Sequence, residues 1–279
     1  MNRAVKKEFK KKLPEELFSA IEKLERSISK QKFKIDQKRA VFDLDNTLLI
    51  GDIGDALFAR LKDAEKKDSV KMDGSRINFS WTEYKNLIKT GKSEKAYRDV
   101  VKSMSGIPVK TVLAFTRELI FNDFMYIEIE NERVPIPFVN PVMEILVVFL
   151  KKLNYEIFVI SASNAMSVKL ISKEFFDIPE ENAYGIESRI RKIDRELSIF
   201  TNELIEPAPV GEGKAQLYFK EKGDILPLIV VGDSRWDIPL LKTVHKNGIS
   251  IWVGEDENIA KDIALMLEDR HDNLLFVKR

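Results

Sequence analysis

Short apolar runs alternate with helical patterns along most of the chain, and this alternation constrains the fold more than any other feature. Four runs have the length and the β-branched content of buried strands: "RAVFDLD" (39–45), "YEIFVISAS" (155–163), "PLIVVGDS" (227–234) and "ISIWVG" (249–254). Helical spacing of apolar residues predicts three helices between them: 141–153, 164–176 and 213–222. Strands that alternate with helices favour a parallel sheet with helices on both faces. The sequence therefore predicts an α/β fold.

Polar side chains stand at the C-terminal ends of three of these predicted strands. Asp43 and Asp45 end the first strand, Ser161 lies near the end of the second, and Asp233 follows the third. In open parallel sheets ligands bind beyond this edge, so we expect these side chains to share a site. Carboxylates crowded at the end of a buried strand repel one another and lose water, and they need a compensating cation.

The composition narrows the chemistry that such a site can use. The chain has no cysteine, which excludes disulfides, thiolate nucleophiles and cysteine-bound zinc. Its two histidines, His245 and His271, leave little material for a histidine metal site, and we interpret both as surface or packing residues. Catalysis is therefore expected from carboxylates, hydroxyls and lysine.

Charge and hydropathy give no sign of a secreted or membrane protein, so a cytoplasmic location is expected. The formal net charge of +1 gives no general attraction to nucleic acid or to a membrane surface. No signal peptide is recognised after the basic start "MNRAVKKEFKKK", and no run approaches the roughly 20 apolar residues of a membrane span. We expect neither nucleic-acid nor membrane partners, and the oligomeric state is left open.

The patterns divide the chain into an N-terminal helical extension, a core and an insert. The extension is 1–35, which contains a predicted amphipathic helix at 14–31 and is expected to pack on the core. The core is 36–55 together with 136–279, with a possible β-hairpin at 185–204. Residues 56–135 are dominated by helical patterns with no strong strand, so this insert is predicted to be a helical cap placed as a lid.

Four short motifs follow one another at strand ends or helix starts. They are "DLDNT" (43–47), "ISAS" (160–163), "GEGK" (211–214) and "GDSRWD" (232–237). Each motif alone is a weak signal, but this order and spacing resemble the haloacid dehalogenase-like superfamily, and within it the magnesium-dependent phosphatases. The resemblance implies a Rossmann-like parallel-sheet core, and the insert matches the usual place of a helical cap.

This resemblance implies a role for each motif residue. Asp43 would be the nucleophile that forms an aspartyl-phosphate, and Asp45 the proton donor and acceptor. The phosphate would be held by residues of three motifs: Thr47, Ser161, Ala162 and Lys214. Magnesium would be held by four aspartates: Asp43, Asp45 through its carbonyl, Asp233 and Asp237. Bound magnesium would be the cation that compensates the crowded carboxylates at the strand ends.

Structural alternatives exist for several of these residues. Asp45 and Asn46 could form an ordinary turn after the strand, and Ser161 could be an ordinary hydroxyl at a strand end. Lys214 could be a solvated helix lysine, although its glycine-rich approach favours close contact with an anion. The four motifs together favour the functional interpretation.

Two further aspartates bear on the substrate. Asp52 and Asp55 lie nine and twelve positions after Asp43, where related phosphoserine and phosphorylcholine phosphatases carry an acidic residue that meets the substrate's amine. The alternative is that either aspartate caps the following helix. Aromatic residues of the insert could likewise form a cage for a cation or the core of the cap: Phe79, Trp81 and Tyr84.

The resulting expectation is a magnesium-dependent phosphatase for a small phosphate ester that carries an amine, such as phosphoserine, phosphocholine or phosphoethanolamine. One alternative is a phosphotransferase or mutase that acts on sugar phosphates, in which a second substrate replaces water. The other alternative is a non-catalytic module that binds a phosphate ligand. Clustered carboxylates speak against this last function, because simple anion binding does not need them.

Overall fold

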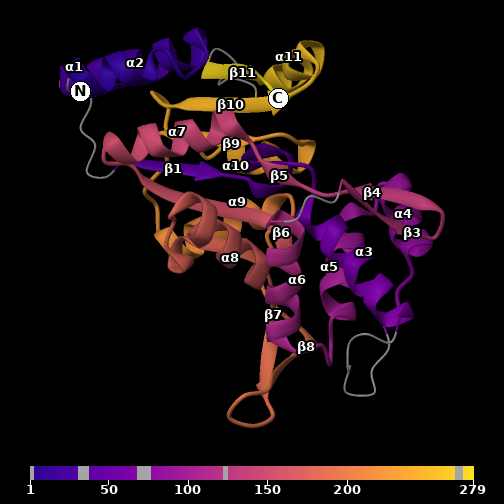
Figure 1. The fold of residues 1–279 in the computed structure, drawn as a ribbon. Coiled ribbons are helices and arrows are strands. Elements are labelled where there is room, and N and C mark those ends of the chain that lie inside the picture. The colour runs from indigo at the N-terminus through magenta and orange to yellow at the C-terminus, as the bar shows by residue number, and fades with distance from the viewer. Residues whose placement is uncertain (1–2, 31–37, 68–76, 122–124, 268–272) are drawn as a thin grey trace. The chain divides into compact units, whose positions relative to one another are not determined.

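The computed structural model describes residues 3–30, 38–67, 77–121, 125–267 and 273–279 (Figure 1). His271 and the predicted domain boundary at residue 35 lie outside these ranges. The chain forms two compact units. Unit 1 comprises 1–50, 139–160 and 211–279, and unit 2 comprises 51–138 and 161–210.

A seven-stranded sheet confirms the predicted α/β class. Its strand order is β11-β10-β9-β1-β6-β7-β8. The strands are β1 (Arg39–Phe42), β6 (Glu156–Asn164), β7 (Ala183–Lys192), β8 (Ser198–Ile205), β9 (Ile229–Gly232), β10 (Ile249–Gly254) and β11 (Leu274–Lys278). The pairs β1–β6, β1–β9, β9–β10 and β10–β11 are parallel, and β7–β8 is the antiparallel hairpin predicted at 185–204. Helices flank the strands (Figure 1).

The helices of unit 1 are α1 (Arg3–Phe9), α2 (Glu15–Ser29), α7 (Pro141–Lys152), α9 (Glu212–Lys222), α10 (Ile238–Leu241) and α11 (Glu257–Met266). Of these, α2, α7 and α9 begin and end close to the predicted positions, and the other three were not predicted. Asn140 caps α7, because its Oδ1 accepts hydrogen bonds from the backbone N–H groups of Val142 and Met143. Over the described part of the chain, no helix combines the length and the hydropathy needed to cross a membrane.

Helix α2 is the amphipathic helix predicted near the N-terminus, and it packs within unit 1. The ring of Phe18 stacks on Phe149 of α7, with 5.7 Å between the ring centroids. Glu25 is buried, and its carboxylate accepts hydrogen bonds from the Tyr155 hydroxyl at 2.9 Å and from Lys38 Nζ at 2.7 Å. A buried carboxylate with two donors fixes the helix in one position on its partner.

Unit 2 combines the insert with the segment Ser161–Val210, which the sequence analysis placed in the core. Its helices are α3 (Ile53–Lys66), α4 (Trp81–Lys89), α5 (Ser93–Ser103), α6 (Val109–Phe121) and α8 (Ala165–Phe176), together with the short turn η2 (Glu180–Asn182). Arg98 of α5 forms an ion pair with Glu206, and Thr116 Oγ1 of α6 lies 2.9 Å from Ser167 Oγ of α8. These contacts hold the hairpin and α8 against the helices of the insert.

The insert also contains strands that the sequence analysis did not predict. β3 (Tyr126–Ile129) and β4 (Glu132–Pro135) pair as an antiparallel hairpin. A second short pair, β2 (Leu49–Ile50) with β5 (Phe138–Val139), lies just outside the insert, one strand before it and one after it. The β3–β4 turn places Glu130 and Asn131 at positive φ, 44° and 66°. Two strands of four residues around a turn without glycine leave a weak pattern in the sequence, which is why no strong strand was predicted in this mainly helical insert.

Candidate active site

Asp43 stands at the C-terminal end of the buried strand β1. The whole of β1 is buried between β6 and β9, and the backbone N–H of Asp43 donates to the Val231 carbonyl at 2.9 Å. This bond continues the β1–β9 pairing by one residue and fixes the start of the next turn. The Asp43 side chain is 6% exposed. A carboxylate so far from solvent requires a charged partner.

Lys214 supplies that partner, and it does so for two carboxylates at once. Its Nζ donates to Asp43 Oδ1 at 2.7 Å and to Asp237 Oδ1 at 2.5 Å. All three side chains are buried. Lys214 lies in the first turn of α9, which follows Gly211 at φ 54°, and a Cβ at position 211 would stand 3.2 Å from the Trp236 ring. The glycine therefore allows the close approach that brings the lysine to the strand end.

Asp237 organises the loop after β9. Its Oδ2 accepts hydrogen bonds from the backbone N–H of Asp233 at 3.2 Å, and from the N–H and hydroxyl of Ser234 at 3.0 and 2.8 Å. A Cβ added to Gly232 would come within 2.6 Å of the Asp237 Cβ, so only glycine fits beside this side chain. Both oxygens of Asp237 are thus used, which makes this residue the support of the loop that carries Asp233.

The charges of the site are not balanced by the side chains alone. Burial, together with the carboxylates of Asp237 and Asp45, raises the pKa of Asp43 to about 7 against the opposing effect of Lys214. Burial and the same kind of repulsion raise the pKa of Asp233 well above its ordinary value. Burial opposes the charge of Lys214, but its two carboxylates outweigh this and raise its pKa. The cluster therefore carries surplus negative charge.

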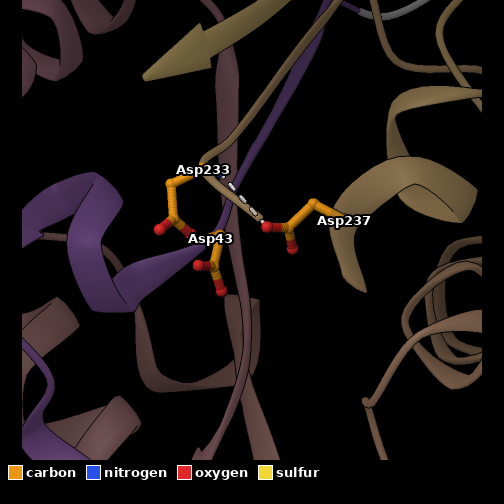
Figure 2. A group of neighbouring side chains, drawn as sticks. All are labelled: Asp43, Asp233 and Asp237. Carbon is orange, nitrogen blue, oxygen red and sulfur yellow. Dashed lines mark hydrogen bonds between the residues drawn. The ribbon is translucent and has the colours of Figure 1, made fainter. Parts of the chain in front are cut away.

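The arrangement fits a divalent cation bound by oxygen. Asp43, Asp233 and Asp237 each offer a carboxylate oxygen, and these atoms lie within 4.8 Å of one another. Figure 2 shows the three side chains turned toward a common region, with the bond from the Asp233 backbone to Asp237 as a dashed line. Hard oxygen donors with surplus negative charge are what Mg²⁺ requires. Because Asp237 already serves four donor contacts, Asp43 and Asp233 are better suited to direct coordination.

The turn η1 (Leu44–Leu48) carries two further predicted residues. Asp45 is half-buried, and Asn46 follows it at φ 55°, a left-handed conformation that asparagine tolerates. Asn140 holds this turn, because its Nδ2 donates to the Thr47 carbonyl at 3.1 Å. The Thr47 hydroxyl is buried and has no partner among the described residues. Since solvent does not reach it, contact with a phosphate requires local movement of the turn, and its phosphate role stays a prediction.

The other predicted site residues belong to unit 2. Ser161 and Ala162 lie in the last part of β6, and Ser161 Oγ accepts a hydrogen bond from the backbone N–H of Ser163 at 3.0 Å. Asp52 caps α3, since its Oδ1 accepts from the Asp55 N–H at 2.9 Å. This is the structural alternative considered for Asp52, and it occupies one of its two carboxylate oxygens.

Asp55 accepts a hydrogen bond from the hydroxyl of Tyr84, a residue that the sequence analysis named only as a cap aromatic. The rings of Phe58, Phe79, Trp81 and Tyr97 surround Tyr84, with centroids 5.4 to 6.5 Å away. Trp81 and Tyr84 are both buried. This packing matches the interpretation of these aromatic residues as cap core.

Three residues that support the site were not assigned a role from the sequence. Ser234 and Asn140 hold the loops that carry Asp233 and Thr47, and the guanidinium of Arg279 lies 4.0 Å from Asp233 Oδ2. Ser234 falls inside the "GDSRWD" motif, which was a usable signal. Arg279 follows β11, a strand that the sequence analysis did not predict, so nothing in its sequence context pointed to the site.

Comparison with known proteins agrees with this geometry. The model of the haloacid dehalogenase-like hydrolase family matches residues 40–242. A conserved protein of unknown function from Anaerococcus prevotii shares 18% identity over 91% of each chain, with a TM-score of 0.62. A phosphoserine phosphohydrolase-like protein from Francisella tularensis shares 18% identity over 86% of this chain and 95% of its own, with a TM-score of 0.52.

A protein of unknown function from Bordetella pertussis is similar in fold as well. It shares 16% identity over 87% of this chain and 99% of its own, with a TM-score of 0.58. No match was found among curated proteins. At these identities the solved structures establish the fold alone, whereas the family model covers most of the chain, including all four motifs. The chain belongs to the haloacid dehalogenase-like hydrolase family.

Proposed function

We propose that this protein is a magnesium-dependent phosphatase that hydrolyses a small phosphate monoester through an aspartyl-phosphate on Asp43. The observation that carries the proposal is the buried lysine shared by Asp43 and Asp237, beside the third carboxylate of Asp233. A lysine in this position supports a nucleophilic carboxylate and a phosphoryl group together. A site that only binds anions has no use for a cluster of carboxylates with surplus negative charge.

In the first step Asp43 attacks phosphorus. A carboxylate oxygen forms the new bond to phosphorus, and the bond from phosphorus to the ester oxygen breaks. Asp45 gives a proton to the departing oxygen, which leaves as an alcohol. The half-buried position of Asp45, two residues after the nucleophile in a turn anchored by Asn140, supports this assignment.

In the second step water replaces Asp43 at phosphorus. Asp45 takes a proton from the water, the oxygen of the water bonds to phosphorus, and the bond to Asp43 breaks to release inorganic phosphate. Lys214 stabilises the negative charge of the phosphoryl oxygens, with Thr47, Ser161 and the backbone N–H of Ala162 as further proposed donors. Asp43, Asp233 and the Asp45 carbonyl would hold Mg²⁺, which would neutralise part of the negative charge of the carboxylates and the phosphate when bound.

The test is a panel of phosphate esters with purified protein. We expect release of inorganic phosphate from at least one small ester in the presence of magnesium, and no release in excess chelator. The panel includes phosphoserine, phosphocholine, phosphoethanolamine, sugar phosphates and p-nitrophenyl phosphate. Hydrolysis that continues in chelator would contradict the metal role. Transfer of the phosphoryl group to an added sugar alcohol, faster than to water, would identify a phosphotransferase instead.

We further propose that the substrate carries a positively charged amine, recognised by Asp52 or Asp55. The support is their position nine and twelve residues after the nucleophile, together with their half-buried carboxylates on the first turn of α3. A negative group remote from the phosphate site selects a substrate with a positive group at its other end. The hydroxyl of Tyr84 uses one oxygen of Asp55 and orients it.

We expect Asp52→Asn or Asp55→Asn to raise KM for the amine-bearing ester about five- to tenfold, because one charged contact is lost away from the reacting bond. KM for p-nitrophenyl phosphate, which has no amine, should stay unchanged. Asp63→Asn on the same helix is the matched control. The amine hypothesis is wrong if sugar phosphates are the best substrates, or if both variants retain the wild-type KM.

A further inference from the structure

The guanidinium of Arg279 is held beside the carboxylate cluster from the far edge of the sheet. The backbone N–H of Arg279 donates to the Gly254 carbonyl at 2.9 Å, directly after the parallel pairing of β11 with β10. Its Nη1 donates to the Asn46 carbonyl at 3.2 Å and lies 4.0 Å from Asp233 Oδ2. One side chain thus contacts the turn after the nucleophile and approaches the loop after β9.

The contacts of this side chain restrict how it can act. Nη1 is directed at Asn46 and Asp233, and Nε lies 3.4 Å from Glu255 Oε1. The Arg279 side chain is 20% exposed, so its charge is only partly screened, whereas Glu255 is 63% exposed and offsets that charge weakly. The guanidinium is therefore a fixed positive charge next to the site, and its hydrogen bonds hold it in place.

The formal charges of the site indicate what the Arg279 guanidinium contributes. Asp43, Asp233 and Asp237 bring three negative charges, and Lys214 with a divalent cation brings three positive charges. Asp45 is protonated in the state that donates to the leaving oxygen, so without another cation the loaded site would be neutral when a phosphate dianion arrives. Arg279 adds one positive charge beside this neutral site and so favours binding of the dianion. In agreement with this position, Arg279 opposes the effects that raise the pKa of Asp233.

We propose that Arg279 is a positioning residue that sets the affinity of the loaded site for phosphate, through its charge and through its bond to the Asn46 carbonyl. This inference rests on the proposed function, since it assigns Arg279 to the phosphate end of the same site. Arg279 influences the site through its contacts with Asn46 and Asp233 and forms no bond with the reacting atoms. Its effect should therefore appear in binding of the phosphate group and much less in the chemical step.

The experiment measures binding of inorganic phosphate to magnesium-loaded protein by calorimetry, together with KM and kcat for a hydrolysed ester. We expect Arg279→Gln to weaken phosphate binding and to raise KM about five- to twentyfold, since a charge near a dianion in a partly screened site has an effect of this size. The value of kcat should change less than about threefold. Arg279→Lys, which keeps the charge, should recover most of the affinity.

Lys278→Gln is the matched control, because Lys278 is an exposed cation one residue earlier at the end of β11. It should bind phosphate as the wild type does. Thermal unfolding of each variant checks that the sheet edge is intact. Wild-type phosphate affinity in Arg279→Gln, or failure of the wild type to bind phosphate at all, overturns the inference. Turnover of the ester panel by the wild type is a separate result, and it tests only the proposed function and not the role of Arg279.

Discussion

Replacement of Asp43 by Asn is expected to lower kcat by about 10⁴-fold or more, because an amide cannot attack phosphorus to form the covalent intermediate. Steady-state hydrolysis of the best ester in the panel measures this loss. The protein should remain folded, because Lys214 keeps its second partner, Asp237. Asp224→Asn, at an exposed position, is the matched control and should retain wild-type turnover.

In the absence of metal, Asp43→Asn is expected to keep or raise the stability of the folded protein, although it lowers turnover. The pKa of Asp43 is raised to about 7 in the folded protein, above the ordinary value of 3.8. The contribution of such a group to stability is present below the lower value and is lost as the pH rises through about 7. Asp43→Asn in chelator should therefore match or exceed the wild-type melting temperature at pH 8, with a smaller gain at pH 5. An inactive variant that is also unfolded at both pH values would not support the nucleophile assignment, and near wild-type turnover would exclude it.

The second large effect is expected for Lys214→Met. Removal of the ammonium leaves Asp43 and Asp237 buried without their shared donor, which destabilises the fold by about 3–5 kcal/mol and abolishes activity. Denaturant unfolding in chelator at pH 8 measures the change in the free energy of unfolding. The loss should be smaller at pH 5, because Asp43 is then protonated in the folded state and no longer needs a cation.

Lys220→Met tests the same substitution at an exposed position of the same helix and should change stability little. Added magnesium should restore part of the stability of Lys214→Met, since a divalent cation also compensates the carboxylates. An equal loss of stability at pH 5 and pH 8 would argue that packing of the lysine stem, and not its charge, holds the site together.

The sequence was sufficient to predict the parts of this protein whose signals are local. Apolar strands that end in polar residues, such as β1 before Asp43 and β9 before Asp233, identified the sheet and the edge where the carboxylates gather. The structure brings Asp43 and Asp233 together, as the strand ends predicted, and adds Lys214 and Asp237, which only the family resemblance had assigned to the site. Periodicity also placed α7, α8 and α9 to within a few residues.

The features that the sequence did not reveal leave a weak periodic pattern or none. Asp237 accepts hydrogen bonds from Asp233 and Ser234 within its own loop, and neither helical nor strand periodicity records such a loop. Arg279 reaches the Asn46 carbonyl across 233 positions of sequence. The short strands β3 and β4 have too few residues for alternation to stand out. The contact of Arg279 with Asn46 arises from tertiary packing, which a one-dimensional pattern does not encode.

The shared lysine has a consequence for how the protein becomes active. Asp43 and Lys214 are 171 positions apart, and all of unit 2 lies between them in the sequence, in two segments separated by 139–160. Contacts of such long sequence separation form late, because closing a large loop is entropically unfavourable until other contacts hold its ends. The pairing of Lys214 with Asp43 is therefore absent from any early, locally structured state of the chain. Recovery of turnover during refolding would report the completion of the sheet, while recovery of helical signal would precede it.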